Sequence, residues 1–344
     1  MIDASIGCIA SRRIQRGSPS LTSGLRRLGS TVALLALGAG LPAVVHAQTF
    51  LLTWGSRGSG PGQFSLPYAV AVDVDDNVYV TDVNDDRLQK FTSGGAYLTQ
   101  WGSSGIQSGQ FLGPTGVAVD VHGNVFVADT YSRIQVFSSN GTFLTQWGTW
   151  GVGDGQFEGE LSVAVSPADI VYVGDNKLLR IQAFTATGTY LTQWGTAGSG
   201  DGQFGSPHGL AVDVNGDVYV TDFVNNRMEK FTGSGAFITQ WGTVGAGRGQ
   251  FNSPLFVAVD GAGNVYVTDS MSRVQKFTNS GTFLTQWGTY GSGQGEFDYE
   301  HGVAVDALGN VYIADSGNSR IQKFGAVPTP TRATSWGRLK SLFR

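Results

Sequence analysis

A pattern that repeats every 46 or 47 residues is the feature that most constrains the fold of this chain. A Trp-Gly pair, an aspartate and a phenylalanine each recur six times at that spacing. A period of this length indicates an array of one supersecondary unit, whose copies bury their apolar faces against each other. The recurring residues are Trp54, Trp101, Trp147, Trp194, Trp241 and Trp287; Asp82, Asp129, Asp175, Asp222, Asp269 and Asp315; and Phe91, Phe137, Phe184, Phe231, Phe277 and Phe324.

Each unit contains four short segments in which apolar and polar residues alternate, separated by Gly, Asn and Asp. In the first unit these segments are 69–73, 77–82, 88–92 and 97–101. Such alternation, bounded by turn residues, predicts antiparallel strands joined by tight turns. Four strands in each of six units predict an all-β fold, a six-bladed β-propeller.

The two ends of the array indicate how the ring closes. Residues 49–55 (TFLLTWG) match the outermost strand of a later unit, 142–148 (TFLTQWG), but precede the first full unit. The last unit ends at Phe324 and lacks that strand. We therefore expect residues 49–55 to complete the sixth blade, which removes a free sheet edge.

The N-terminal segment, residues 1–47, resembles an export signal peptide. Five arginines precede an apolar, uncharged run from Thr31 to Val45, and a cut before Gln48 is predicted. The alternative is an N-terminal membrane anchor. The single cysteine, Cys8, lies in this segment. The predicted mature protein, residues 48–325 with a tail, is secreted, extracellular or on the cell surface, with the periplasm as an alternative, and has no transmembrane span.

The C-terminal segment, residues 326–344, differs from the repeats in composition. A spacer with two prolines, 327–331, precedes a basic stretch in which Trp336, Leu339 and Phe343 share one helical face. Such a tail suits anchoring or sorting. The alternative is a strip that docks on the chain's own domain.

Charge argues against a nucleic-acid partner. Residues 48–325 contain 13 Lys and Arg and 25 Asp and Glu, a net charge of −12. A body of that charge repels phosphate backbones.

Two units carry the sequence of a known repeat. Asn264–Asp269 (NVYVTD) is followed by Arg273–Phe277 (RVQKF), and Gly309–Asp315 (GNVYIAD) by Asn318–Phe324 (NSRIQKF). This pattern resembles the NHL-repeat family and recurs over about residues 49–324. The family includes secreted bacterial propellers, sensor domains of receptor kinases, RNA-binding domains and peptide-amidating lyases. The resemblance implies a propeller fold and leaves the activity open.

Residues present in every unit are interpreted as structural. We expect the Trp to cover the seam between blades, the Asp/Arg pairs such as Asp82 with Arg87 to clasp a turn, and the Gln-Phe or Glu-Phe after each glycine-rich connector to pack as an apolar plug. Asp73-Val-Asp-Asp-Asn77 begins like a calcium loop but lacks its glycine and distant glutamate, so a hairpin turn is favoured.

Positions that differ between units are more informative about function. One position near the start of the innermost strand reads Tyr68, Thr115, Leu161, His208, Leu255 and His301. The segments around His208 and His301 look like the zinc-histidine segments of amidating lyases. A third histidine is lacking, because His122 falls at a turn on the opposite face. A mixed metal site of His208, His301 and Glu300 is one interpretation; ordinary solvated histidines are the other.

The loops between the second and third strands also diverge. They place Tyr131, Leu178, Phe223 and Met271 at comparable positions, and two connectors carry Trp150 and Tyr290. Aromatic residues and Met on a loop face are typical of recognition surfaces. Packing against the neighbouring blade is the alternative.

The sequence thus predicts a binding or scaffold module for a protein, peptide or glycan, with no required cofactor. The predicted ligand-binding residues at the channel mouth and loop face are Tyr68, His208, His301, Tyr131, Phe223 and Met271. The alternative is a metal-assisted lyase or hydrolase at the channel mouth, similar to amidating or streptogramin lyases, with a divalent metal on His208, His301 and Glu300.

Overall fold

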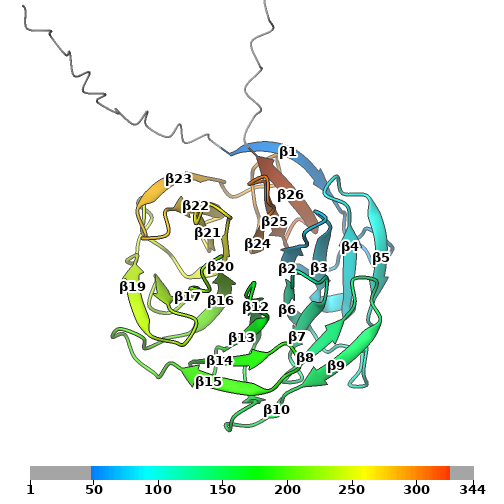
Figure 1. Cartoon of the computed structure of the whole chain (residues 1–344). Helices are drawn as coiled ribbons and strands as arrows, with labels where there is room; N and C mark the ends of the chain where they lie inside the picture. The colour runs from blue at the N-terminus through cyan, green and yellow to red at the C-terminus, as the bar shows by residue number, and fades with distance from the viewer. Residues whose placement is uncertain (1–47, 326–344) are drawn as a thin grey trace, which may run out of the picture. The chain divides into compact units, whose positions relative to one another are not determined.

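Six antiparallel sheets of four strands each are arranged around a common axis in the computed structural model, which describes residues 48–325 (Figure 1). The predicted six-bladed β-propeller is confirmed. A two-stranded parallel sheet, β10 (Thr149–Trp150) with β11 (Gln156–Phe157), and a short 3-10 turn, Val83–Asp85, complete the secondary structure of the described residues. No helix in this part of the chain is long and apolar enough to cross a membrane.

The blades follow one another along the chain, each with its innermost strand first. Blade 1 contains β2 (Pro67–Val72), β3 (Val78–Asp82), β4 (Arg87–Phe91) and β5 (Tyr97–Trp101). Blade 2 contains β6 (Pro114–Val119), β7 (Val125–Asp129), β8 (Arg133–Phe137) and β9 (Phe143–Trp147). Blade 3 contains β12 (Leu161–Val165), β13 (Ile170–Asp175), β14 (Arg180–Thr185) and β15 (Tyr190–Trp194). Blade 4 contains β16 (Pro207–Val212), β17 (Val218–Asp222), β18 (Arg227–Phe231) and β19 (Phe237–Trp241). Blade 5 contains β20 (Pro254–Val259), β21 (Val265–Asp269), β22 (Arg273–Phe277) and β23 (Phe283–Trp287).

Blade 6 joins the two ends of the ring. It contains β24 (Glu300–Val305), β25 (Val311–Asp315) and β26 (Arg320–Gly325), and its outermost strand is β1 (Thr49–Trp54). Strand β1 pairs antiparallel with β26, from Thr49 opposite Gly325 to Trp54 opposite Ile321 (Figure 1). The predicted closure by the N-terminal strand is confirmed. The predicted signal peptide and C-terminal tail lie outside the described residues and stay predictions.

The tryptophans of the outermost strands cover the seams between blades, as predicted. Trp54 of blade 6 lies 5.9 Å from the ring of Phe91 in blade 1 and 6.2 Å from that of Tyr312 in its own blade. Each of five indoles also lies against a turn glycine of the next blade, where a Cβ would come within 2.6–2.8 Å of the ring. These glycines are Gly95, Gly141, Gly188, Gly235 and Gly281, all with positive φ.

The connector phenylalanines form the predicted apolar plugs. Phe64 is fully buried, with its ring 5.6 Å from that of Phe91. The same contact recurs in the other blades, for example between Phe157 and Phe184 at 5.9 Å. Each core cluster combines residues of two neighbouring blades, so stability depends on the seams.

Replacing a seam glycine tests this dependence. Gly188→Ala places a methyl group 2.7 Å from the Trp147 indole, whereas Gly216→Ala, at a similar φ, meets nothing within 4 Å. Both variants incur about 1–2 kcal/mol for a positive φ. We expect Gly188→Ala to lose about 1–3 kcal/mol more because its seam is overpacked. Urea unfolding measures the difference, and equal losses in the two variants would contradict this role of the indole.

Candidate functional site

Two faces of the ring are distinguished by the connections that they carry. We call loop face the one that holds the loops between second and third strands and the connectors between blades. We call hairpin face the opposite one, which holds the turns between first and second strands, such as 73–77. The predicted site residues belong to the loop face and to the mouth of the channel there.

The loop face is held by buried ion pairs, as the predicted clasp requires. In blade 1, Arg87 Nη2 lies 3.1 Å from Asp82 Oδ2 and also donates to the Gln63 carbonyl in the connector, at 2.8 Å. Asp82 in turn accepts hydrogen bonds from the backbone amides of Ser65 and Leu66. The pair therefore ties a loop to a connector, which is a positioning role.

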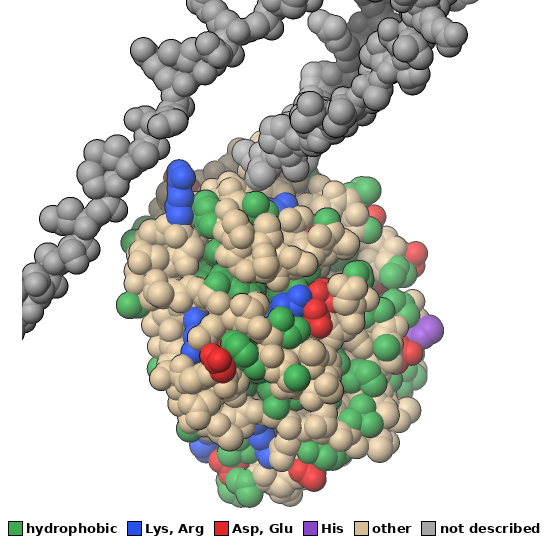
Figure 2. Space-filling view, turned by 60° about the vertical axis from the view of Figure 1, so that its left-hand side comes forward, with side chains coloured by type: hydrophobic (Ala, Val, Ile, Leu, Met, Phe, Trp, Pro, Cys, Tyr) green, Lys and Arg blue, Asp and Glu red, His purple; other side chains and the backbone are tan. Residues whose placement is uncertain are grey.

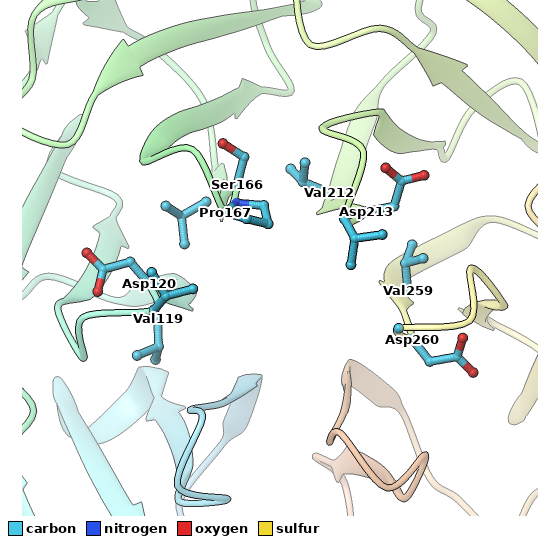
Figure 3. A pocket seen from close by; sticks show the side chains of 12 residues that line it. Val119, Asp120, Ser166, Pro167, Val212, Asp213, Val259 and Asp260 are labelled. Atoms are coloured by element: carbon cyan, nitrogen blue, oxygen red, sulfur yellow. The ribbon is translucent and has the colours of Figure 1, made fainter.

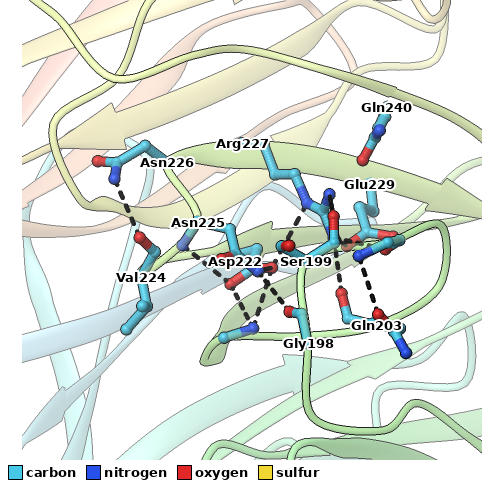
Figure 4. A network of polar contacts seen from close by, with 12 residues as sticks. Gly198, Ser199, Gln203, Asp222, Val224, Asn225, Asn226, Arg227, Glu229 and Gln240 are labelled. Atoms are coloured by element: carbon cyan, nitrogen blue, oxygen red, sulfur yellow. Dashed lines mark hydrogen bonds and ion pairs between the residues drawn. The ribbon is translucent and has the colours of Figure 1, made fainter.

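Blade 4 carries a variation of this clasp (Figure 4). Where the other blades have glutamine, it has Glu229, which is fully buried, accepts from Arg227 Nη2 at 2.6 Å and accepts from the Gly202 amide at 2.9 Å. Burial raises the pKa of Glu229 to about 7, against the lowering effect of Arg227. This carboxyl therefore titrates near neutral pH inside the fold.

The channel mouth on the loop face brings together four of the predicted residues, Tyr68, His208, His301 and Phe223. The Tyr68 ring lies 4.3 Å from that of His301, and the two histidines are close enough for His208 to help lower the pKa of His301. The Tyr68 hydroxyl donates to Glu160, and burial together with that carboxylate raises the pKa of Tyr68. The result is a cluster of aromatic and polar side chains drawn from blades 1, 3, 4 and 6.

Phe256 completes the cluster and was missed by the sequence analysis. Its ring lies 5.4 Å from that of Tyr68 and 5.8 Å from that of His208. The corresponding residues in the other blades are all small, and this contrast was a readable signal. They are Ala69, Gly116, Ser162, Gly209 and Gly302.

The space left at this mouth is small. The pocket bounded by Thr115, Glu160, Ser162, His208 and Phe256 holds about 170 Å³. Small-molecule sites usually enclose about 300–1,000 Å³. This pocket, on the side of the mouth formed by His208 and Phe256, is therefore too small for a ligand of ordinary size.

Both histidines are neutral at physiological pH. Burial lowers the pKa of His208, and burial followed by His208 lowers that of His301 to about 4. His301 Nδ1 lies 2.8 Å from Ser316 Oγ, whereas His208 Nδ1 has no hydrogen-bond partner among residues 48–325. Neutral imidazoles are competent metal ligands, so the question is which third ligand could join them.

Glu300, the third residue of the predicted metal site, is buried in the interior. It is 1% exposed, and burial, with Asp269 and Asp315 nearby, raises its pKa to about 9. Its Oε1 lacks a hydrogen-bond partner within the described part of the chain. No three His, Cys, Asp or Glu side chains of residues 48–325 form a group that could hold a metal ion. The structure thus places His208 and His301 together, and the metal site of His208, His301 and Glu300 stays a prediction.

The hairpin face carries the remaining candidates. His122 lies there, as predicted, with Nε2 3.3 Å from Asp169 Oδ2. The channel mouth on this face holds about 440 Å³; valines such as Val119 and Val212 line it, and the carboxylates of Asp120, Asp213 and Asp260 point away from it (Figure 3). Asp73 accepts from the amides of Asp75 and Asn77, which is a hairpin turn.

The predicted loop residues divide into two groups. Tyr131 and Met271 are 49% and 38% exposed, and the connector residues Trp150 and Tyr290 are 69% and 76% exposed. Phe223 is only partly exposed and stacks on His208, with ring centroids 5.6 Å apart. Phe223 therefore belongs to the wall of the channel mouth.

Tyr131 and Trp150 line one groove at the rim of the loop face, between blades 2 and 3. The groove holds about 870 Å³. The structure brings Ile106 of the preceding connector to the same place, which sequence reasoning did not foresee. The other lining residues are Thr130, Ser132, Arg133, Gln146, Gly148 and Thr149.

The pH dependence of stability tests the buried carboxyl in blade 4. In the unfolded chain Glu229 ionises near the usual glutamate pKa of 4.5, whereas the folded state keeps the proton up to about pH 7. Folding is therefore progressively disfavoured as the pH rises from about 4.5 to 7. Glu229→Gln does not titrate, so it should match the wild type near pH 4 and exceed its stability by up to about 3 kcal/mol above pH 7.

The reverse change in blade 5 is the matched control. Gln275 accepts from the Gly249 amide and donates to the Gln250 carbonyl. Gln275→Glu should lose stability as the pH rises over the same interval. Denaturant unfolding from pH 4 to 8 measures both effects, and a pH-independent difference in either variant would contradict the account.

The metal content of the purified protein tests the third-ligand argument. We expect no stoichiometric divalent metal on the chain after purification from metal-replete medium, because Glu300 is not grouped with His208 and His301. Elemental analysis beside a His208→Ala/His301→Ala variant measures this. A stoichiometric metal that is lost in the double variant would prove the expectation wrong.

Comparisons with known proteins agree with this architecture. The family model for the NHL repeat matches residues 204–231, in blade 4, and 298–324, in blade 6. No curated protein matches the sequence significantly.

Solved structures share the fold at low sequence identity. One is a protein of unknown function from Bacteroides thetaiotaomicron, with 20% identity, a TM-score of 0.64, and 81% of this chain and 76% of that chain covered. Another is virginiamycin B lyase from Staphylococcus aureus, with 12% identity, a TM-score of 0.55, and 82% of this chain and 99% of that chain covered. A third is a gluconolactonase from Xanthomonas campestris, with 14% identity, a TM-score of 0.58, and 78% of this chain and 88% of that chain covered. Identities this low establish only the common fold. Together with the repeat match and the observed topology, they make the chain a six-bladed β-propeller that carries NHL repeats.

Proposed function

We propose that this propeller is a non-catalytic binding or scaffold module that engages a protein, peptide or glycan on its loop face. The observation that carries the proposal is the groove in which Tyr131 and Trp150, both strongly exposed, face the same space of about 870 Å³. Exposed aromatic side chains that line a concavity are typical of recognition sites.

The groove lies where the repeat departs from its own pattern. The connector position occupied by Trp150 is aromatic in two of the six connectors and otherwise small, aliphatic or charged. In blades 2 and 5 the clasp arginine follows its aspartate by four residues, one fewer than in the other blades. These changes alter the loops and leave the strands of the ring unchanged. Loops that vary on a constant scaffold are typical of binding surfaces. The six connector residues are Arg57, Ser104, Trp150, Ala197, Val244 and Tyr290.

The walls of the groove are preorganised. Arg133 donates to the Ile106 carbonyl at 2.7 Å and to the Gln110 carbonyl at 2.7 Å, which fixes one connector. Trp150 stands in β10, which pairs with β11. A ligand therefore binds without ordering these loops, and the entropic cost of association is low.

A partner with a phosphate backbone fits this surface poorly. The repeat region has a net charge of −12, and on the face in Figure 2 lysine and arginine side chains are scattered among acidic ones. The alternative function, a metal-assisted lyase or hydrolase at the channel mouth, has less support. The pocket beside His208 and Phe256 at the mouth holds about 170 Å³, and the two histidines lack a grouped third ligand among residues 48–325.

Arrays of glycans and of short peptides test the proposal directly. Wild-type protein should be retained by members of at least one array, because the groove is open and preformed. Trp150→Ala should lose most of that retention, whereas Leu308→Ala, which removes an 80% exposed side chain on the hairpin face, should keep it. Retention by neither array, or loss in Leu308→Ala alone, would overturn the proposal.

A further inference from the structure

We infer that the groove between blades 2 and 3 is a subsite for a neutral oligosaccharide, with Trp150 and Tyr131 as its stacking platforms. This inference rests on the proposed binding function and narrows its ligand class. It is carried by three properties of the groove: flat exposed rings, a charge that is neutralised inside the protein, and hydroxyl and amide groups beside the rings.

Both aromatic rings are exposed, and that of Tyr131 is held in place. The Arg133 guanidinium lies 5.4 Å from the centre of the Tyr131 ring, and the Tyr131 amide donates to Asp129 Oδ1 at 3.0 Å. Even so, 49% of Tyr131 and 69% of Trp150 remains accessible. Rigid aromatic faces give large contact area at little conformational cost. The C–H faces of a pyranose ring are flat and apolar, and they match such platforms.

The charge of the groove points to a neutral ligand. Arg133 is the one charged residue among those that line it, and its Nε lies 3.0 Å from the buried Asp129 Oδ2. Its other nitrogens donate to backbone carbonyls and to Gln146 Oε1. The guanidinium is therefore already compensated, and a phosphate, sulfate or uronate group would gain little from it.

The polar groups around the rings are side chains with both donors and acceptors. Thr130, Thr149 and Gln146 are all exposed, but the Thr130 hydroxyl donates to the Leu112 carbonyl and Gln146 Oε1 accepts from Arg133. The Thr149 hydroxyl and the Gln146 amide nitrogen can donate to a ligand, and the Thr130 hydroxyl can accept from one. Sugar hydroxyls both donate and accept, so they pair with such groups. A peptide bound as an added strand needs free backbone donors and acceptors. Here the Gly151 amide donates to the Phe157 carbonyl and the Ile106 carbonyl accepts from Arg133, so a backbone group on each side of the groove is already engaged.

The opposite side of the ring supplies a matched control. Tyr290 occupies the connector position of Trp150 in blade 5 and is 76% exposed. The neighbouring positions differ, because Met271 is the repeat equivalent of Tyr131 and Ala246 is that of Ile106. Tyr290→Ala therefore removes an equally exposed ring from the same face and leaves the groove untouched.

Calorimetric titration with neutral hexasaccharides tests the inference. The probes are cellohexaose, laminarihexaose, xylohexaose and mannohexaose, with a hexagalacturonate and a decaproline peptide as competitors of different chemistry. We expect one or more neutral hexasaccharides to bind with a single site per chain. Trp150→Ala should weaken that affinity by at least about tenfold, and Trp150→Phe should recover most of it because a flat ring is restored.

The outcomes separate this inference from the proposed function. Binding of decaproline or hexagalacturonate with no neutral hexasaccharide bound would overturn the assignment to a neutral oligosaccharide and leave a binding module. No binding by any probe or by either array would overturn both. An equal loss of affinity in Tyr290→Ala and Trp150→Ala, with melting temperatures unchanged, would overturn the assignment to this groove.

Discussion

The contact between an indole and a glycine across the blade seams is the interaction on which the rest of the structure depends. A sheet of four short strands cannot bury its faces alone, so each blade is stabilised by its neighbours. At five seams the indole lies where a Cβ would come within 2.6–2.8 Å of the ring, so glycine is required at each of these turns. One of the five is the seam between blades 6 and 1, where Trp54 of β1 contacts Gly95 and strand pairing of β1 with β26 closes the ring.

In this closed ring, the buried Asp/Arg clasps stabilise the fold, whereas other, exposed side chains are available for recognition. The clasps fix the connectors through backbone carbonyls, as Arg87 does with Gln63, so the exposed side chains on those connectors are free to differ. Trp150 and Tyr290 show this freedom, and Glu229 and Phe256 show it in the interior. Glu229 lowers stability toward neutral pH, and Phe256 closes a channel mouth that its small counterparts would leave more open.

The fold could be predicted almost completely from three features of the sequence. The repeat period indicates the units, the alternation of apolar and polar residues indicates the strands, and the outer strand displaced to the N-terminus indicates how the ring closes. The site could not be predicted in this way. The groove brings together Ile106, Tyr131 and Trp150 from three segments, and only the curvature of the ring places them at one seam. Spacing indicated that Glu300 lies near the histidines, but not that its side chain, opposite Asp315 in the strand register, is buried. Phe223, expected on the exposed surface, stacks on His208 because both side chains belong to blade 4 and lie at the channel mouth.

We propose that recognition lies at one rim of a rigid ring. Hydrogen–deuterium exchange, measured with and without the ligand that the arrays retain most strongly, tests it most directly. We expect added protection in residues 104–107, 129–133 and 148–152, with the hairpin face and the seams unchanged. Protection confined to the hairpin-face turns, or spread evenly over all the blades, would contradict it.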